Sequence, residues 1–297
     1  MLGSAVPLRR KANACFVGIR AKDWIGYLGM CLVGYGFGVA VTPASAFDPL
    51  LILKSHLSCA LFLSFCFLIN NYADVDSDRL DLSKMAKNPI ASGLMNSADA
   101  VSLSVAAATC GFAVSTTMPN WTSIAIYLAL AALGWAYSVP PLRLKGRPVA
   151  DVVSHGFMLG VFLFFYGYSS ATSGLLSTDV QLVGMSMFTC SAIFELRNHL
   201  HDLSADAISG TVTTVGWLGE QASKRLLFAI TFVHLVLLTM ILVGISSYAA
   251  YFVPPGLVLL GVLVITKVVS PARAFDYVTV AVYFAAMIPK LVPIFLG

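Results

Sequence analysis

Runs of about 20 apolar residues recur from Trp24 to the C-terminus, and they restrict the fold more than any other feature. A helix of about 20 residues spans the ~30 Å hydrocarbon core of a bilayer. Soluble domains carry about 25% charged residues, whereas this chain has 11% charged and 58% hydrophobic residues. The sequence therefore predicts an all-α integral membrane protein that forms a single domain over residues 1–297.

We predict nine transmembrane helices in one bundle around a central cavity, with loops that cap one end. The predicted spans are residues 24–41, 50–71, 98–117, 121–138, 149–169, 179–199, 223–246, 250–269 and 276–296. Residues 1–22 carry Arg9, Arg10 and Lys11 and are expected to lie at the membrane interface as a basic lead-in. The cysteines form no C-x-x-C pair, which predicts neither disulfides nor a zinc site.

The positions of the basic residues support this count of spans. If the spans alternate in direction, one side of the membrane holds the N-terminus and every Lys and Arg except Lys54 and Lys290. The positive-inside rule makes this side cytoplasmic. We therefore expect the N-terminus in the cytoplasm and the C-terminus on the far side.

Two copies of one polar pattern follow apolar runs on that predicted cytoplasmic side. The first motif is Asn70, Asp74 and Asp78, and the second motif is Asn198, Asp202 and Asp206. Residues four apart lie on one face of a helix, about 6 Å apart along its axis. Because like charges at this spacing repel, a cation between them is expected. The second and sixth spans point the same way, which predicts a parallel pseudo-repeat of four-helix units.

The carboxylate and amide oxygens of these motifs are ligands that Mg²⁺ prefers. Magnesium typically binds one or two carboxylates together with phosphate oxygens, so two facing motifs predict a Mg²⁺ site for a diphosphate group. The four aspartates are the catalytic candidates because bound metal ions stabilise a departing diphosphate. The alternative interpretation is that these side chains only cap helices and follow turn chemistry.

We expect a proline-containing loop to supply cations for the phosphates that the metal ions do not reach, although anchoring by the positive-inside rule would also explain these cations. It follows the fourth span and contains Tyr137, Pro140, Pro141, Arg143 and Lys145. Cations in such positions bind phosphate oxygens strongly. Arg79 and Lys87 are further candidates after the first motif, whereas Lys84 and Arg147 are interpreted as positive-inside anchors.

Ionisable residues within predicted spans are functional candidates by default. Glu195 and Arg197 lie just before Asn198, and Glu195 is a candidate to take a proton from an acceptor. We interpret His155 as a packed histidine and exclude His199 from the metal site. The aromatic run at 162–168 either faces lipid or lines a tunnel in which aromatic rings stabilise a carbocation.

The two motifs and the intervening Tyr137-Ser-x-Pro-Pro-x-Arg-Leu-Lys145 segment resemble the UbiA superfamily of intramembrane prenyltransferases. The resemblance covers nearly the whole chain and implies a nine-helix bundle in which both motifs bind Mg²⁺ and a polyprenyl diphosphate. It also implies that Tyr137 and Lys145 contact the diphosphate. Many members have lysine four residues after the tyrosine, where this chain has Pro141, so the choice between Arg143 and Lys145 stays open.

The sequence accordingly predicts a Mg²⁺-dependent enzyme that transfers a polyprenyl group to a lipophilic acceptor in the membrane. Ionisation of the diphosphate would give an allylic cation that a nucleophile attacks. One alternative is a terpene cyclase of the same family, which needs no separate acceptor. The other is a cation or organic-anion transporter, although transporter sites usually lie near the bilayer midplane. We expect membrane lipids as surroundings and no nucleic-acid partner.

Overall fold

The computed structural model describes residues 8–42, 48–174, 176–245, 267 and 270–296. Within these ranges the chain is helical and contains no strand. The helices are α1 (Leu8–Ile19), η1 (Ala21–Trp24), α2 (Ile25–Ala40), α3 (Pro49–Ala73), α4 (Val75–Asp78), α5 (Leu82–Lys87), α6 (Ser97–Ser115), α7 (Trp121–Ser138), η3 (Leu144–Gly146), α8 (Ala150–His155), η4 (Gly156–Phe162), α9 (Leu163–Ala171), α10 (Thr178–Ser209), α11 (Thr214–Leu218), α12 (Glu220–Ile245) and α14 (Pro271–Leu296).

Six of the described helical segments are long and apolar enough to cross a membrane. They are α3, α6, α7, the combined α8–η4–α9 segment Ala150–Ala171, α12 and α14. Helix α2, with 16 residues, corresponds to the first predicted span. The 32-residue helix α10 contains the sixth predicted span. The predicted span 250–269 lies almost entirely outside the described residues.

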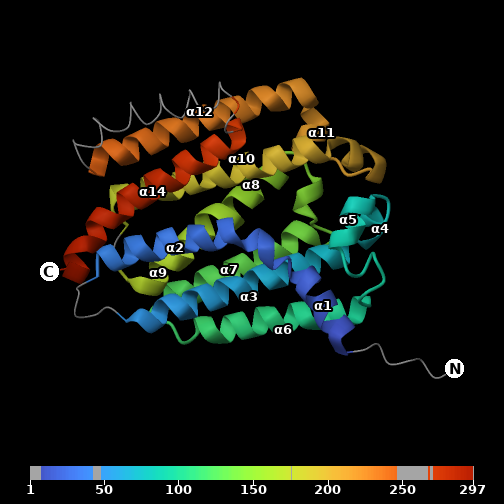
Figure 1. Cartoon of the computed structure of the whole chain (residues 1–297), viewed down its shortest axis with the longest axis horizontal. Helices are drawn as coiled ribbons and strands as arrows, with labels where there is room; N and C mark the ends of the chain where they lie inside the picture. Colours follow the sequence, from blue (N-terminus) through green and yellow to red (C-terminus); the bar gives the residue numbers. More distant parts are fainter. Residues whose placement is uncertain (1–7, 43–47, 175, 246–266, 268–269, 297) are drawn as a thin grey trace.

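The long helices run side by side along the long axis of the molecule (Figure 1). Helices α1, α4, α5 and α11 lie at one end, and the last turn of α14 lies at the other. We call the end with α1, α4, α5 and α11 the motif end, because the C-terminal parts of α3 and α10, where the two motifs lie, are located there. The fold thus brings together two segments that are more than 100 residues apart in the sequence.

Helix α2 packs tightly against α9 because glycines remove side chains at their crossing. A Cβ atom at Gly34 would lie 1.9 Å from the Phe164 carbonyl oxygen, and one at Gly167 would lie 2.0 Å from the Cys31 carbonyl oxygen. Small residues allow such close backbone approach between membrane helices, where lipid is as apolar as the side chains. Any larger residue at these two positions would force the helices apart.

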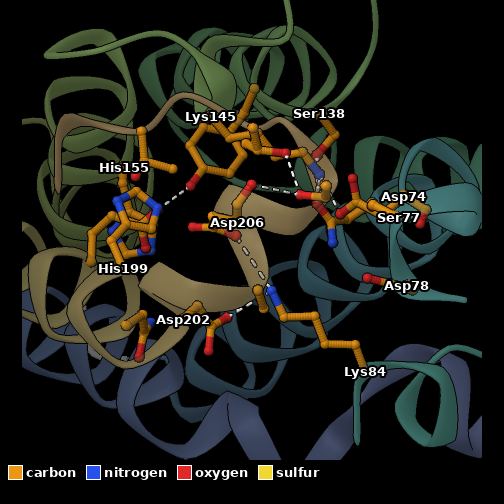
Figure 2. Close-up of a pocket in the computed structure, with 18 of the residues that line it drawn as sticks. Asp74, Ser77, Asp78, Lys84, Ser138, Lys145, His155, His199, Asp202 and Asp206 are labelled. Carbon is orange, nitrogen blue, oxygen red and sulfur yellow. Dashed lines mark hydrogen bonds and ion pairs between the residues drawn. The ribbon is translucent and has the colours of Figure 1, made fainter. Parts of the chain in front are cut away.

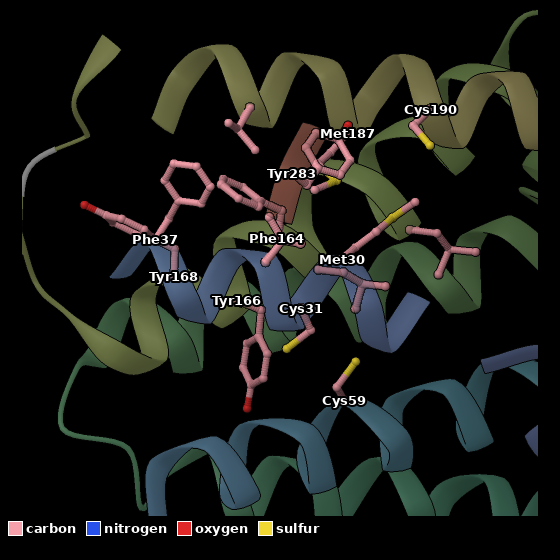
Figure 3. Packing of buried hydrophobic residues seen from close by; sticks show 14 of the residues in the cluster. Met30, Cys31, Phe37, Cys59, Phe164, Tyr166, Tyr168, Met187, Cys190 and Tyr283 are labelled. Atoms are coloured by element: carbon pink, nitrogen blue, oxygen red, sulfur yellow. The ribbon is translucent and has the colours of Figure 1, made fainter. Parts of the chain in front are cut away.

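Large apolar side chains fill the centre of the bundle around this crossing (Figure 3). Phe164 and Tyr166 of the aromatic run are fully buried, and Tyr168 is almost so. These rings pack against residues of α2 and α10 such as Phe37 and Met187. The central rings of the run therefore form protein core instead of a lipid-facing surface.

Candidate active site

Both motifs line a single cavity of about 530 Å³ at the motif end of the bundle (Figure 2). Its polar lining includes all six motif residues together with Arg20, Lys84, Tyr137, Ser138, Arg143, Lys145, His155, Glu195 and His199. Deeper in the bundle the lining becomes apolar, with Leu63, Cys66, Phe67, Met158 and Leu159. The cavity therefore has a charged mouth and an apolar interior, as an amphiphilic substrate requires.

The first motif does not lie on one continuous helix, in contrast to the sequence prediction. Helix α3 ends at Ala73, and Asp74 adopts non-helical angles (φ −104°, ψ 4°) before α4 begins. Asp78 is buried and accepts a hydrogen bond of 2.8 Å from Asn88 Nδ2. This burial raises the pKa of the Asp78 carboxyl, although the Asn88 hydrogen bond opposes the rise. The backbone N–H of Asp78 still donates to the Asp74 carbonyl oxygen at 2.8 Å, so the spacing of four residues persists across the interruption.

The second motif lies on α10, which continues unbroken to Ser209. The ammonium group of Lys84 reaches it from α5, 3.0 Å from Asp202 Oδ2 and 3.4 Å from Asp206 Oδ1. Burial would lower the pKa of Lys84, but the two carboxylates outweigh burial and raise it. The interpretation of Lys84 as a membrane anchor therefore missed a residue of the site. No local pattern in the sequence marks this pairing, which joins residues 122 positions apart.

Arg143 and Lys145 both contact residues of the first motif. The sequence left open which of these two cations would bind diphosphate, and the structure places both of them at the site. Arg143 Nη2 lies 3.0 Å from Asp74 Oδ1, and Nη1 donates to the Ala73 carbonyl oxygen at 3.0 Å. Lys145 contacts the other Asp74 oxygen and lies 2.6 Å from Asn70 Oδ1. Burial lowers the pKa of Lys145, and the Asp74 carboxylate opposes this effect.

Other predicted diphosphate contacts have different neighbours in the structure. Arg79 lies outside the cavity lining, and its guanidinium contacts Asp76 at 3.4 Å on the surface. Lys87 is exposed and also outside the lining. The Tyr137 hydroxyl lines the cavity but donates a hydrogen bond to Glu195 Oε1.

The charged groups that precede Asn198 on α10 have distinct surroundings. Arg197 forms an ion pair of 3.1 Å with Asp276 of α14, which ties two helices of the bundle together. Glu195 instead faces the cavity and lies within 3.3 Å of two histidines, His155 and His199. The interpretation of His155 as a packed histidine captured its burial but not its contact with a cavity residue.

The donor set of the cavity fits a hard divalent cation that also binds a diphosphate. In each motif two side-chain oxygens converge on one positive charge, Lys84 for Asp202 and Asp206 and Lys145 for Asn70 and Asp74. The described residues contain no group of three His, Cys, Asp or Glu side chains that would hold a metal ion by itself. Magnesium typically accepts one or two carboxylates and takes its other ligands from phosphate and water. The pairs of oxygens therefore suit Mg²⁺ together with a phosphate ligand.

Comparison with known proteins agrees with this geometry. The model of the UbiA prenyltransferase family matches residues 28–285, which is most of the chain. The chain belongs to the UbiA prenyltransferase family. It is therefore a prenyltransferase, and both the family and the enzyme class predicted from the sequence are confirmed.

Several individual UbiA-family proteins are similar to this chain. A lycopene elongase/hydratase of Halobacterium salinarum is 30% identical over 210 residues, covering 69% of this chain and 71% of the relative. A homogentisate phytyltransferase of Synechocystis is 28% identical, covering 69% and 65%. A UbiA homologue from Archaeoglobus fulgidus, solved with GPP and Mg²⁺, superposes with a TM-score of 0.73 at 21% identity, covering 94% of this chain and 99% of that one.

Proposed function

We propose that this UbiA-family enzyme transfers a prenyl group from a prenyl diphosphate to a lipophilic acceptor within the membrane, and that it requires Mg²⁺. The observation that carries the proposal is the convergence of both motifs with Lys84, Arg143 and Lys145 on one cavity. The relative solved with GPP and Mg²⁺ supports this choice of donor and metal. Because the chain is a prenyltransferase, the transporter alternative is rejected.

Mg²⁺ would be held by oxygens of the two motifs, Asn70 and Asp74 on one side and Asp202 and Asp206 on the other. When bound, it neutralises the negative charge that develops on a departing diphosphate. Arg143 and Lys145 lie at the cavity mouth beside these oxygens, where they can donate charge-assisted hydrogen bonds to phosphate. Lys84 can also donate hydrogen bonds to phosphate once Asp202 and Asp206 bind a metal ion in its place.

The apolar interior of the cavity supports a hydrophobic substrate. Leu63 and Cys66 of α3 and Met158 and Leu159 of η4 line it below the charged mouth. An isoprenoid tail buried there gains about 25 cal/mol for each Å² of apolar surface removed from water. A diphosphate at the mouth would therefore place the first prenyl carbon at the boundary between the polar and apolar parts.

We propose that the motif end faces the cytoplasm and the end of α14 faces the opposite side. Of the two Lys or Arg residues predicted on the far side, Lys290 pairs with Asp179 at 2.8 Å. Asp179 lies in the first turn of α10, 19 residues before Asn198 of the second motif. The remaining cations of the chain were predicted on the motif side, in agreement with the positive-inside rule.

The experiment that tests this function uses the purified enzyme in lipid nanodiscs with labelled geranylgeranyl diphosphate and Mg²⁺. Lycopene, homogentisate and geranylgeranylglyceryl phosphate are supplied separately as acceptors. We expect labelled product with at least one acceptor in the wild type and none with Asp74→Asn or Asp202→Asn. Wild-type turnover in either variant would contradict the proposal. Labelled hydrocarbon formed without any acceptor would favour the cyclase alternative.

A further inference from the structure

A second group of ionisable side chains lies inside the cavity, next to the motifs but separate from them. Tyr137 comes from α7, His155 ends α8, and Glu195 and His199 lie on α10. We call these four residues the inner cluster. All four line the cavity, and in Figure 2 the two labelled histidines lie across from Asp74.

The inner cluster is centred on the Glu195 carboxylate, which is 5% exposed. The Tyr137 hydroxyl donates to Oε1, and His199 Nε2 lies 3.0 Å from the same oxygen. His155 Nε2 lies 3.3 Å from Oε2. Three groups that can donate therefore surround the side chain, and this arrangement suits an ionised carboxylate, which only accepts hydrogen bonds.

Each histidine also has a polar neighbour near its other ring nitrogen. His155 Nδ1 lies 2.9 Å from Ser191 Oγ. His199 Nδ1 lies 3.4 Å from Asp151 Oδ2, and Asp151 is fully buried. The carboxylate of Asp151 is in turn fixed by Thr214, whose backbone N–H donates to it at 2.6 Å. His155, anchored by Ser191, and His199 thus position Glu195, and the Asp151 carboxylate lies beside His199 without a hydrogen bond to its Nδ1.

The inner cluster lies where the reacting carbon of a prenyl diphosphate would be. Glu195 precedes Asn198 by three residues on α10, about 5 Å further into the bundle. Tyr137 is followed directly by Ser138, whose hydroxyl donates to Asn70 Oδ1 at 3.2 Å. The cluster therefore adjoins both motifs on the side that faces the apolar interior.

Chemistry at this position releases a proton with every neutral nucleophile. An allylic cation that is attacked by a hydroxyl group, an alkene, an aromatic ring or water gives a neutral product only when one proton leaves. Elimination to a hydrocarbon also releases one proton. Recombination with diphosphate, or capture by another anion, releases none. A buried carboxylate connected to the cavity through a hydroxyl group can accept that proton.

We infer that the inner cluster is the proton acceptor of the reaction, with Tyr137 as the catalytic residue and Glu195 as the destination of the proton. This inference rests on the proposed function. As the bond from the first prenyl carbon to the acceptor forms, the bond from that carbon to diphosphate oxygen has broken. The acceptor's proton passes to Tyr137 Oη while the tyrosine proton passes to Glu195 Oε1, and the bonding electrons remain with the acceptor. Reversal through Tyr137 returns the proton to the departing diphosphate.

The test separates ionisation of the donor from formation of product. Geranylgeranyl diphosphate with ¹⁸O in the bridging position loses that label to the non-bridging positions whenever it ionises and recombines. This exchange is measured alongside all organic-extractable products, with and without the three acceptors named above. In Glu195→Gln we expect exchange within about threefold of wild type and product formation lower by about 10²-fold or more. Tyr137→Phe is expected to show the same split, and Glu195→Asp is expected to recover part of the loss.

A matched control is His234→Gln, which alters a buried histidine outside the cavity lining. His234 is bound by Thr189 at 2.8 Å and Thr279 at 3.1 Å. We expect wild-type exchange and product formation in this variant. Melting temperature and affinity for geranylgeranyl diphosphate are measured for every variant, so that misfolding and loss of donor binding are recognised separately.

Two outcomes would overturn the inference. Product formation within about threefold of wild type in both Glu195→Gln and Tyr137→Phe would show that another group, such as diphosphate itself, takes the proton. Equal losses of exchange and product in folded variants would show that the inner cluster serves donor binding or ionisation. Failure of the proposed function differs from both, because the wild type would then show neither exchange nor product.

Discussion

Replacing Lys84 by methionine should tighten the binding of Mg²⁺ in the absence of a prenyl diphosphate. The ammonium group lies 3.0 Å from Asp202 and 3.4 Å from Asp206, so it competes with a metal ion for the same oxygens. Methionine keeps an unbranched side chain of similar length but carries no charge. The variant thus removes the competitor without opening a large cavity.

The size of the effect follows from the two contacts. One charge pair at ~3.2 Å with an effective dielectric constant of ~20 contributes about 5 kcal/mol before desolvation. The side chains of Lys84 and Asp202 are 27% and 36% exposed, and exposed pairs contribute only about 0.2–1 kcal/mol each. We therefore expect about 1–2 kcal/mol for both contacts. Removing them should strengthen Mg²⁺ binding by about 5- to 30-fold.

Isothermal titration calorimetry of the detergent-purified protein with MgCl₂ measures this change directly. Arg79→Met is the matched control, because Arg79 also pairs with an aspartate but lies outside the cavity lining. Its Mg²⁺ affinity should equal that of the wild type. Unchanged or weaker binding in Lys84→Met would refute the competition between Lys84 and the metal ion.

Three further predictions concern the metal, the buried Asp151 carboxylate and α5. Removing divalent cations with EDTA should abolish product formation, and added Mg²⁺ should restore it; turnover that persists in EDTA would exclude a metal requirement. Thr214→Val should lower the free energy of unfolding by about 1–3 kcal/mol, seen as a lower melting temperature, because buried Asp151 loses its hydroxyl donor. Asp81→Ala should speed amide hydrogen exchange in α5 at pH 7, because Asp81 caps this helix. Hydrogen bonds from Ser83 lower the pKa of Asp81, so the difference between the variant and wild type should fade as the pH falls through the folded-state pKa. An unchanged melting temperature for the first variant, or equal exchange for the second, would contradict the corresponding contact.

The sequence alone established the class of fold and the location of the site along the chain. Long apolar runs require helices that satisfy their own backbone hydrogen bonds in lipid, so the all-helical structure followed directly. The spacing within each motif and the loop from Tyr137 to Lys145 identified residues that do line one cavity. These signals are local, because periodicity and composition depend only on neighbouring residues.

Only the tertiary structure showed which of these residues meet. Lys84 appeared to be an ordinary basic loop residue, yet its side chain reaches from α5 to Asp202 and Asp206 of α10. The spacing also did not reveal the interruption of the helix at Asp74 or the buried contact between Asp78 and Asn88. Tyr137, His155 and Glu195 form a cluster only because α7, α8 and α10 turn particular faces toward one another. Helix rotation and packing are set by contacts across the whole bundle, which no local pattern in the sequence records.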